Sequence, residues 1–153
     1  ESGSMEPTLM VGDLTIANRL AYKHQTPQRG DIIFFEKDGE LLSKRVIGIA
    51  GDTITFVDGK VVINDEVLDE SEYLAEEIRT ECEKTFEVPR NCVFVLGDNR
   101  EDSYDSRYWD EPYVRLRDIE GKLISTIPLG KNCSEIYSTD NMVLNTEEIE
   151  DIP

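Results

Sequence analysis

Apolar residues in this chain fall into short runs separated by turn-forming residues, and few stretches keep a helical periodicity for ten residues. The clearest local signal is Asp58-Gly59, which separates the β-rich runs Thr53–Val57 and Lys60–Asn64. An Asp-Gly pair between such runs is a strong β-hairpin signal, because the favoured two-residue turn needs a positive φ at both positions. The pattern therefore predicts one mostly β domain, folded as a sandwich or a partly closed barrel.

Other stretches support the same fold class. The run Ile32–Phe35 follows a turn and is apolar enough to be covered on both faces. A single helical piece is expected over Glu70–Glu83, although its many like charges repel one another. Strands are also expected at Asp13–Asn18, Leu41–Ile49, Cys92–Leu96 and Gly121–Ile127.

The charge balance excludes several classes of function. The chain has 33 acidic and 16 basic residues, a formal net charge of −17. Nucleic-acid binding needs a concentrated basic surface, so no nucleic-acid partner is expected. The single histidine and the three cysteines, which have no metal-binding spacing, argue against a metal site, and no cofactor is expected. No run of 18 apolar residues is present.

Two segments are unusually acidic. Residues 64–87, called the acidic segment below, contain ten acids and two bases, and we expect them to form a solvated excursion from the core sheet. Residues 132–153 contain six acids and no base, a composition typical of a terminal tail.

Serine and lysine remain as candidates for catalysis. His24, which a Ser-His-Asp triad would require, lies in a polar turn-like stretch, and Cys92 lies in an apolar strand where an inert thiol is expected. Strand alternation places Lys44 between apolar neighbours on its face. Burial would lower the pKa of its amine, and a neutral lysine can act as general base towards a serine. The alternative is an edge lysine whose charged end reaches water.

Two further segments could supply the rest of such a site. The turn Ser2-Gly3-Ser4 exposes a hydroxyl and leaves backbone N–H groups available, although such runs are also common in linkers. The segment Gly97–Trp109 follows a strand and is rich in turn formers, so it could equally be a structural loop. Within it, Asp105 and Arg107 are two residues apart and able to pair.

These motifs together resemble the conserved motifs of bacterial type I signal peptidases, over about residues 2–128. The resemblance implies a mostly β fold of antiparallel sheets with a small variable inserted lobe, here residues 64–87. It also implies a serine/lysine peptidase catalytic domain at 1–130. The acidic C-terminal tail, 131–153, departs from the family pattern, in which it has no counterpart, and its role is unknown. The motifs are Ser4-Met5-Glu6-Pro7-Thr8-Leu9, Arg29-Gly30-Asp31-Ile32, Lys44-Arg45-Val46-Ile47-Gly48 with Gly51-Asp52, and Gly97-Asp98-Asn99-Arg100 through Ser103 and Asp105-Ser106-Arg107.

The resemblance also implies a role for each matching residue. Ser4 would be the nucleophile and Lys44 the general base. The oxyanion hole would combine the backbone N–H of Ser4 with the hydroxyl of Ser2. Ser103 would hydrogen-bond the lysine and orient it. An ion pair between Asp105 and Arg107 would support the site from behind.

By the same resemblance, the substrates would be signal peptides of secretory preproteins, bound as an added strand and cleaved after small residues in an Ala-x-Ala pattern. A single-pass anchor is expected before Glu1, with the catalytic domain on the extracytoplasmic face of the cell membrane and in contact with membrane lipid. The alternatives are a self-cleaving domain of the LexA type and an inactive homologue that acts as a binding module. The pocket walls would be formed by Met5, Leu9, Thr15, Phe34, Leu42 and Ser43, of which Thr15 and Ser43 are more polar than the family pattern suggests.

Overall fold

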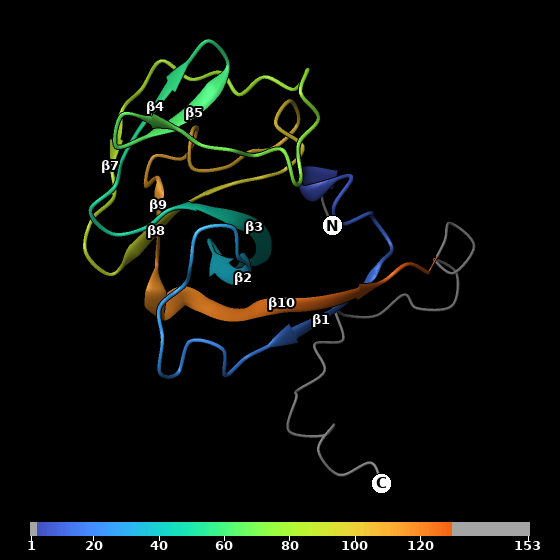
Figure 1. Cartoon of the computed structure of the whole chain (residues 1–153). Coiled ribbons are helices and arrows are strands. Elements are labelled where there is room, and N and C mark those ends of the chain that lie inside the picture. The colour runs from blue at the N-terminus through green and yellow to red at the C-terminus, as the bar shows by residue number, and fades with distance from the viewer. Residues whose placement is uncertain (1–2, 130–153) are drawn as a thin grey trace, which may run out of the picture.

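The computed structural model describes residues 3–129 and consists mainly of two antiparallel sheets (Figure 1). The larger sheet has the strand order β1-β10-β2-β3-β8-β9, and the smaller has the order β6-β5-β4-β7. The large sheet contains β1 (Leu14–Asn18), β2 (Ile32–Lys37), β3 (Glu40–Gly48), β8 (Cys92–Leu96), β9 (Tyr113–Arg115) and β10 (Ile119–Ile127). The small sheet contains β4 (Thr53–Val57), β5 (Lys60–Ile63), β6 (Glu66–Val67) and β7 (Phe86–Glu87), and the two 3-10 turns are η1 (Gly3–Met5) and η2 (Leu116–Asp118).

The mostly β fold class is confirmed, and each expected strand is present. Asp58 and Gly59 connect β4 to β5 with φ values of 52° and 75°, as the hairpin signal predicts. The helix expected over Glu70–Glu83 is wrong, because this stretch forms only turns and irregular backbone. Strands β6, β7 and β9 were not expected, since runs of two or three residues are too short to show an alternating pattern.

Strands β3 and β8 lie between two hydrophobic clusters, and each strand buries side chains on both faces. On one face, Ile47 and Phe94 pack with Ile54 of β4 and Val61 of β5, which joins the small sheet to the large one. On the other face, Val46 packs with residues that include Ile33, Phe35, Val95 and Trp109. The expectation that Ile32–Phe35 is covered on both faces is also met, since Ile32 belongs to a separate cluster with Met5 and Leu9.

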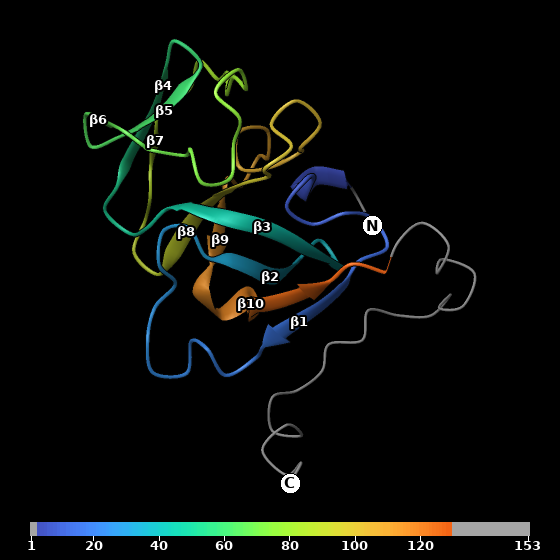
Figure 2. The same ribbon diagram turned by 45° about the vertical axis from the view of Figure 1, so that its right-hand side comes forward.

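The acidic segment is less solvated than its composition suggests. It supplies β6 and β7 to the small sheet, and Thr80 and Phe86 within it are buried. In the view of Figure 2, the loop formed by the acidic segment reaches towards η1 and the loop that follows β8. The expectation of a simple excursion from the core is therefore only partly right.

Candidate active site

Ser4 and Lys44 form the centre of the candidate site. η1 carries Ser4 and β3 carries Lys44, and the Lys44 amine donates a hydrogen bond to the Ser4 hydroxyl, with 2.5 Å between Nζ and Oγ. Both residues are buried, at 5% exposure for Ser4 and 2% for Lys44. Strand alternation left open a buried lysine or an edge lysine whose charged end reaches water, and the structure shows the buried one.

The environment of Lys44 favours its neutral form. Desolvation by burial lowers the pKa of the amine below its ordinary value of 10.5, and the nearby negative charge of Asp105 opposes this by raising the pKa. The effect of burial is the larger of the two. A neutral amine at hydrogen-bonding distance from a hydroxyl can remove its proton, so the pair has the geometry of an activated nucleophile.

One edge of β3 is unpaired at Lys44 and the residues before it. Strand β8 pairs with β3 from Arg45, opposite Leu96, to Gly48, and beyond Leu96 the chain leaves the sheet. Gly97, the first residue after β8, allows a close approach, because a Cβ there would collide with the Ser103 hydroxyl and the Ser4 carbonyl oxygen. Among the described strands, only β2 pairs with residues 40–44 of β3, so their other edge is unpaired beside the dyad.

The loop after β8 holds the turn that carries Ser4. The backbone N–H of Asn99 donates to the Ser4 carbonyl at 3.0 Å, and the Asn99 side chain donates to the Gly3 carbonyl at 3.0 Å. Asp98 accepts two hydrogen bonds from the Arg45 guanidinium, at 2.9 and 2.7 Å, and one from the Thr8 hydroxyl at 2.5 Å. The nucleophile turn is thus fixed to a loop about 95 residues away in the sequence.

The ion pair expected between Asp105 and Arg107 is present. The Asp105 carboxylate accepts hydrogen bonds from Nε and Nη2 of Arg107 at 2.9 and 3.0 Å, and both side chains are almost completely buried. The same carboxylate accepts a hydrogen bond from the Gly97 backbone at 3.0 Å. The pair therefore fixes the point at which the loop leaves β8.

Ser103 does not make the hydrogen bond that was expected of it. Its side chain is buried next to Gly97, but its hydroxyl has no hydrogen-bond partner among residues 3–129. The expected hydrogen bond between Ser103 and Lys44 is absent from this structure, in which the Lys44 amine reaches the Ser4 hydroxyl. Ser2, the other expected oxyanion-hole donor, lies outside the described residues.

The expected pocket residues do not all lie together. Met5 and Leu9 pack against Ile32 at the start of β2. Phe34 is two residues further along β2, and thus on the same face, and it pairs directly with Ser43 of β3. Two of the expected residues lie apart from this group. Leu42 packs into the cluster on the opposite face, and Thr15 lies on β1, which β10 separates from β2.

Other reactive side chains lie outside this arrangement. His24 is exposed in the connection between β1 and β2, as its polar surroundings suggest. Burial raises the pKa of the Cys92 thiol, which agrees with an inert cysteine. Cys82 and Cys92 are free thiols, and Cys133 lies outside the described residues. No helix within residues 3–129 is long and apolar enough to cross a membrane.

A serine hydroxyl that is hydrogen-bonded to a buried lysine amine on a β-sheet scaffold is the arrangement of a serine–lysine hydrolase. The sequence profile described as "Signal peptidase, peptidase S26" matches residues 1–127 of the chain. The chain therefore belongs to the S26 signal peptidase family, and the resemblance described from its motifs is confirmed.

Individual relatives agree with this assignment. The chain is 39% identical over 116 residues to "Probable signal peptidase I-2" of Synechocystis sp., covering 71% of this chain and 52% of that protein. It is 38% identical over 135 residues to "Signal peptidase I" of Leptolyngbya laminosa, covering 80% and 64%, respectively. The chain thus spans between about half and two thirds of the length of these two relatives.

A solved structure supports the fold. The crystal structure of a signal peptidase I from Enterococcus faecalis V583 matches with a TM-score of 0.57 and 32% sequence identity. The match covers 65% of this chain and 98% of the other. The mostly β architecture expected from the motifs is therefore that of a known signal peptidase I.

Proposed function

We propose that this chain is the catalytic part of a membrane-bound serine endopeptidase that removes signal peptides from exported preproteins. Membership of the signal peptidase family supports the substrate class. The observation that carries the proposal is the buried contact of 2.5 Å between the Lys44 amine and the Ser4 hydroxyl. A hydroxyl and a base at this distance are what acyl transfer to serine requires.

In the proposed reaction, Ser4 Oγ attacks the carbonyl carbon of the scissile peptide bond while the neutral Lys44 amine takes the hydroxyl proton. The resulting ammonium gives this proton to the leaving amine as the C–N bond breaks, which leaves an acyl ester on Ser4. Lys44 then removes a proton from the water that attacks the ester carbonyl. The resulting ammonium returns this proton to Ser4 Oγ as the acyl C–O bond breaks, which releases the new carboxyl terminus and restores the serine. The backbone N–H of Ser4 and the hydroxyl of Ser2 would bind the oxyanion of each tetrahedral intermediate.

The unpaired edge of β3 suggests how the substrate binds. Residues 40–44 could accept the backbone of an extended peptide as an additional strand, with its scissile bond beside Lys44. Beyond Arg45 the same edge is occupied by β8, so the added strand would extend from Lys44 towards Glu40. Met5, Leu9, Phe34 and Ser43 would offer shallow walls for small side chains, in agreement with cleavage after Ala-x-Ala.

Membrane contact is supported by exposed apolar side chains at one end of the ribbon formed by β1 and β10. Met10 and Val11 lie in the turn before β1 and are 45% and 55% exposed. Ile127 pairs with Leu14 at the start of β1 and is 44% exposed. Together they form an apolar end of the β1–β10 ribbon, which would face the lipid surface on the extracytoplasmic side.

The decisive experiment is turnover of a peptide derived from a signal peptide with an Ala-x-Ala cleavage site. Ser4→Ala is expected to remain folded and to lose cleavage, because the attacking oxygen is removed. Ser71→Ala, the same substitution at an exposed serine of the acidic segment, is the matched control and is expected to cleave normally. A folded Ser4→Ala protein that keeps a substantial part of the original kcat would contradict the nucleophile assignment.

A further inference from the structure

Arg100 connects the acidic segment to the loop beside the dyad. Its side chain is completely buried, and its two terminal nitrogens donate to the Glu70 carboxylate at 2.6 and 3.1 Å. Thr80, also in the acidic segment, accepts a further hydrogen bond from Arg100 at 2.5 Å. A buried guanidinium needs a charged partner, so the position of Arg100 depends on Glu70.

Arg100 in turn supports the loop that holds the nucleophile. Its Nε donates to the Gly97 carbonyl at 2.9 Å, and its own carbonyl accepts a hydrogen bond from Arg107 at 2.9 Å. Between Gly97 and Arg100 lies Asn99, whose two hydrogen bonds fix Gly3 and Ser4. A chain of contacts therefore leads from Glu70 through Arg100 and the loop to the nucleophile turn.

A second set of contacts runs through Tyr73. The Tyr73 hydroxyl donates to Glu70 at 2.9 Å, and the Arg45 guanidinium lies over the Tyr73 ring, 3.9 Å from its centroid. Arg45 is the residue that binds Asp98 in two places, and Asp98 binds Thr8 just beyond η1. The acidic segment thus contacts the nucleophile support from two directions.

We propose that Glu70 is a positioning residue for the nucleophile, acting through Arg100 and the loop 97–103, and this proposal rests on the function proposed above. The acidic segment then does more than extend the small sheet, because its carboxylate at position 70 sets the place of Ser4 relative to Lys44. Since small displacements of reacting groups strongly affect the chemical step, the effect of Glu70 falls on kcat. The proposed substrate edge is formed by residues 40–44 of β3, so KM is expected to change less than kcat.

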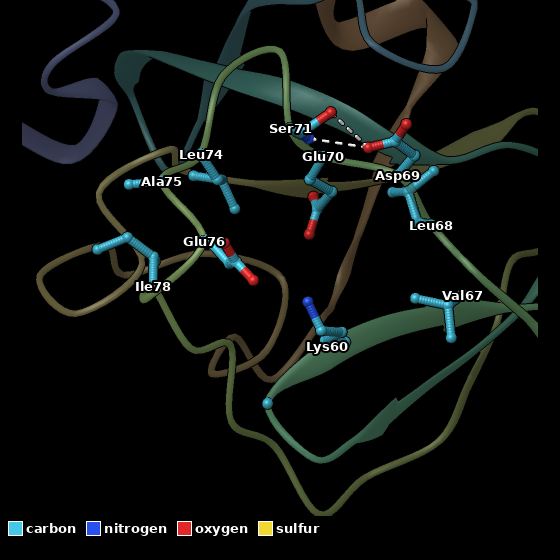
Figure 3. Close-up of a pocket in the computed structure, with 11 residues that line it drawn as sticks. Lys60, Val67, Leu68, Asp69, Glu70, Ser71, Leu74, Ala75, Glu76 and Ile78 are labelled. Atoms are coloured by element: carbon cyan, nitrogen blue, oxygen red, sulfur yellow. Dashed lines mark hydrogen bonds between the residues drawn. The ribbon is translucent and has the colours of Figure 1, made fainter.

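The acidic segment offers a matched control. Glu70 and Glu76 both line a cavity of about 660 Å³ between the acidic segment and β5 (Figure 3). Glu76 is exposed, unlike the Glu70 carboxylate that binds Arg100. Glu70→Gln and Glu76→Gln therefore make the same change of charge in one cavity, but only the first disturbs the contacts to Arg100.

The test measures kcat and KM for the Ala-x-Ala peptide well below the unfolding temperature, with rates expressed per folded molecule. Glu70→Gln is expected to lower kcat on the order of 10- to 100-fold with KM within about threefold of the original. Glu76→Gln is expected to change neither by more than about twofold. A folded Glu70→Gln protein with unchanged kcat, or an equal loss in Glu76→Gln, would overturn the proposal.

A double variant separates positioning from general loss of stability. Asn99→Ala removes the side-chain contact to Gly3 and should itself lower kcat. If Glu70 acts through the same loop, Glu70→Gln combined with Asn99→Ala lowers kcat by less than the product of the single effects. Independent, multiplicative effects would overturn the proposal.

Tyr73→Phe, together with the Ser4→Ala variant described above, keeps the result decisive. If Glu70→Gln does not fold, Tyr73→Phe removes one hydrogen bond from Glu70 and keeps the ring under Arg45, and a loss of a few-fold in kcat is expected. Unchanged kcat in Tyr73→Phe would then reject the positioning role. Retained cleavage by Ser4→Ala would reject the proposed function itself, whereas an inactive Ser4→Ala with a fully active Glu70→Gln would reject only the role of Glu70.

Discussion

Asp105 offers a sharp test of the site, because its replacement by asparagine should have two separable effects. The carboxylate is fully buried and accepts hydrogen bonds from Arg107 at 2.9, 3.0 and 3.3 Å and from the Gly97 backbone at 3.0 Å. Asp105→Asn keeps the shape of the side chain but leaves the Arg107 guanidinium buried without a counter-charge. Breaking a buried ion pair in this way costs about 3–5 kcal/mol.

That cost converts into a measurable shift in thermal unfolding. For a domain of this size, 1 kcal/mol changes Tm by about 2–4 °C, so a decrease of about 6–20 °C is expected. Calorimetry or circular dichroism would measure it. Asp118→Asn is the matched control, because the Asp118 carboxylate lies 3.8 Å from Arg117 at an exposed position, and its Tm should change by no more than about 2 °C.

The second effect is on the pH dependence of cleavage. The Asp105 charge raises the pKa of Lys44, against the larger lowering caused by burial. Removing that charge should lower the pKa of Lys44 further, so the rise of kcat/KM with pH should move to more acidic pH. An unchanged Tm, or a shift of the pH profile to more alkaline pH, would refute the reasoning that places Asp105 between Arg107 and the dyad.

Three further results are expected from the same geometry. In the original protein, kcat/KM should rise with pH through an apparent pKa below 10.5, and Lys44→Arg should be inactive in the peptide assay, since arginine cannot be deprotonated in a protein. Because the folded state lowers the pKa of Lys44, the unfolded state binds more protons, so the free energy of unfolding should rise with pH up to about the unfolded pKa. Chemical denaturation of Lys44→Met at several pH values should show that the part of this pH dependence that is due to Lys44 is lost. Gly97→Ala should lower both Tm and kcat, because the new Cβ would collide with Ser103 and the Ser4 carbonyl; normal values for both would show that the loop can move aside.

Local features of the sequence predicted much of the fold because they depend on neighbouring residues. The Asp58-Gly59 pair forms the predicted hairpin turn because both residues adopt positive φ values. Alternation in β3 correctly predicted that Lys44 shares a face with Leu42 and Val46, although it left open whether the amine is buried. The ordered motifs correctly indicated the signal peptidase family. The pairing of Asp105 with Arg107 was predictable for the same reason, since the two residues are only two positions apart in the loop.

The tertiary structure decided which distant groups meet. The sequence could not show that Asn99 holds the carbonyl of Ser4, or that Glu70 of the acidic segment pairs with Arg100, because these partners are far apart in the chain and meet only when it is folded. It also suggested a helix over Glu70–Glu83, where the chain instead forms turns that bring Glu70, Tyr73 and Thr80 towards the loop after β8. Patterns of apolar and turn-forming residues specify strands and turns, whereas a buried charge is satisfied by whichever partner the folded chain brings within hydrogen-bonding distance.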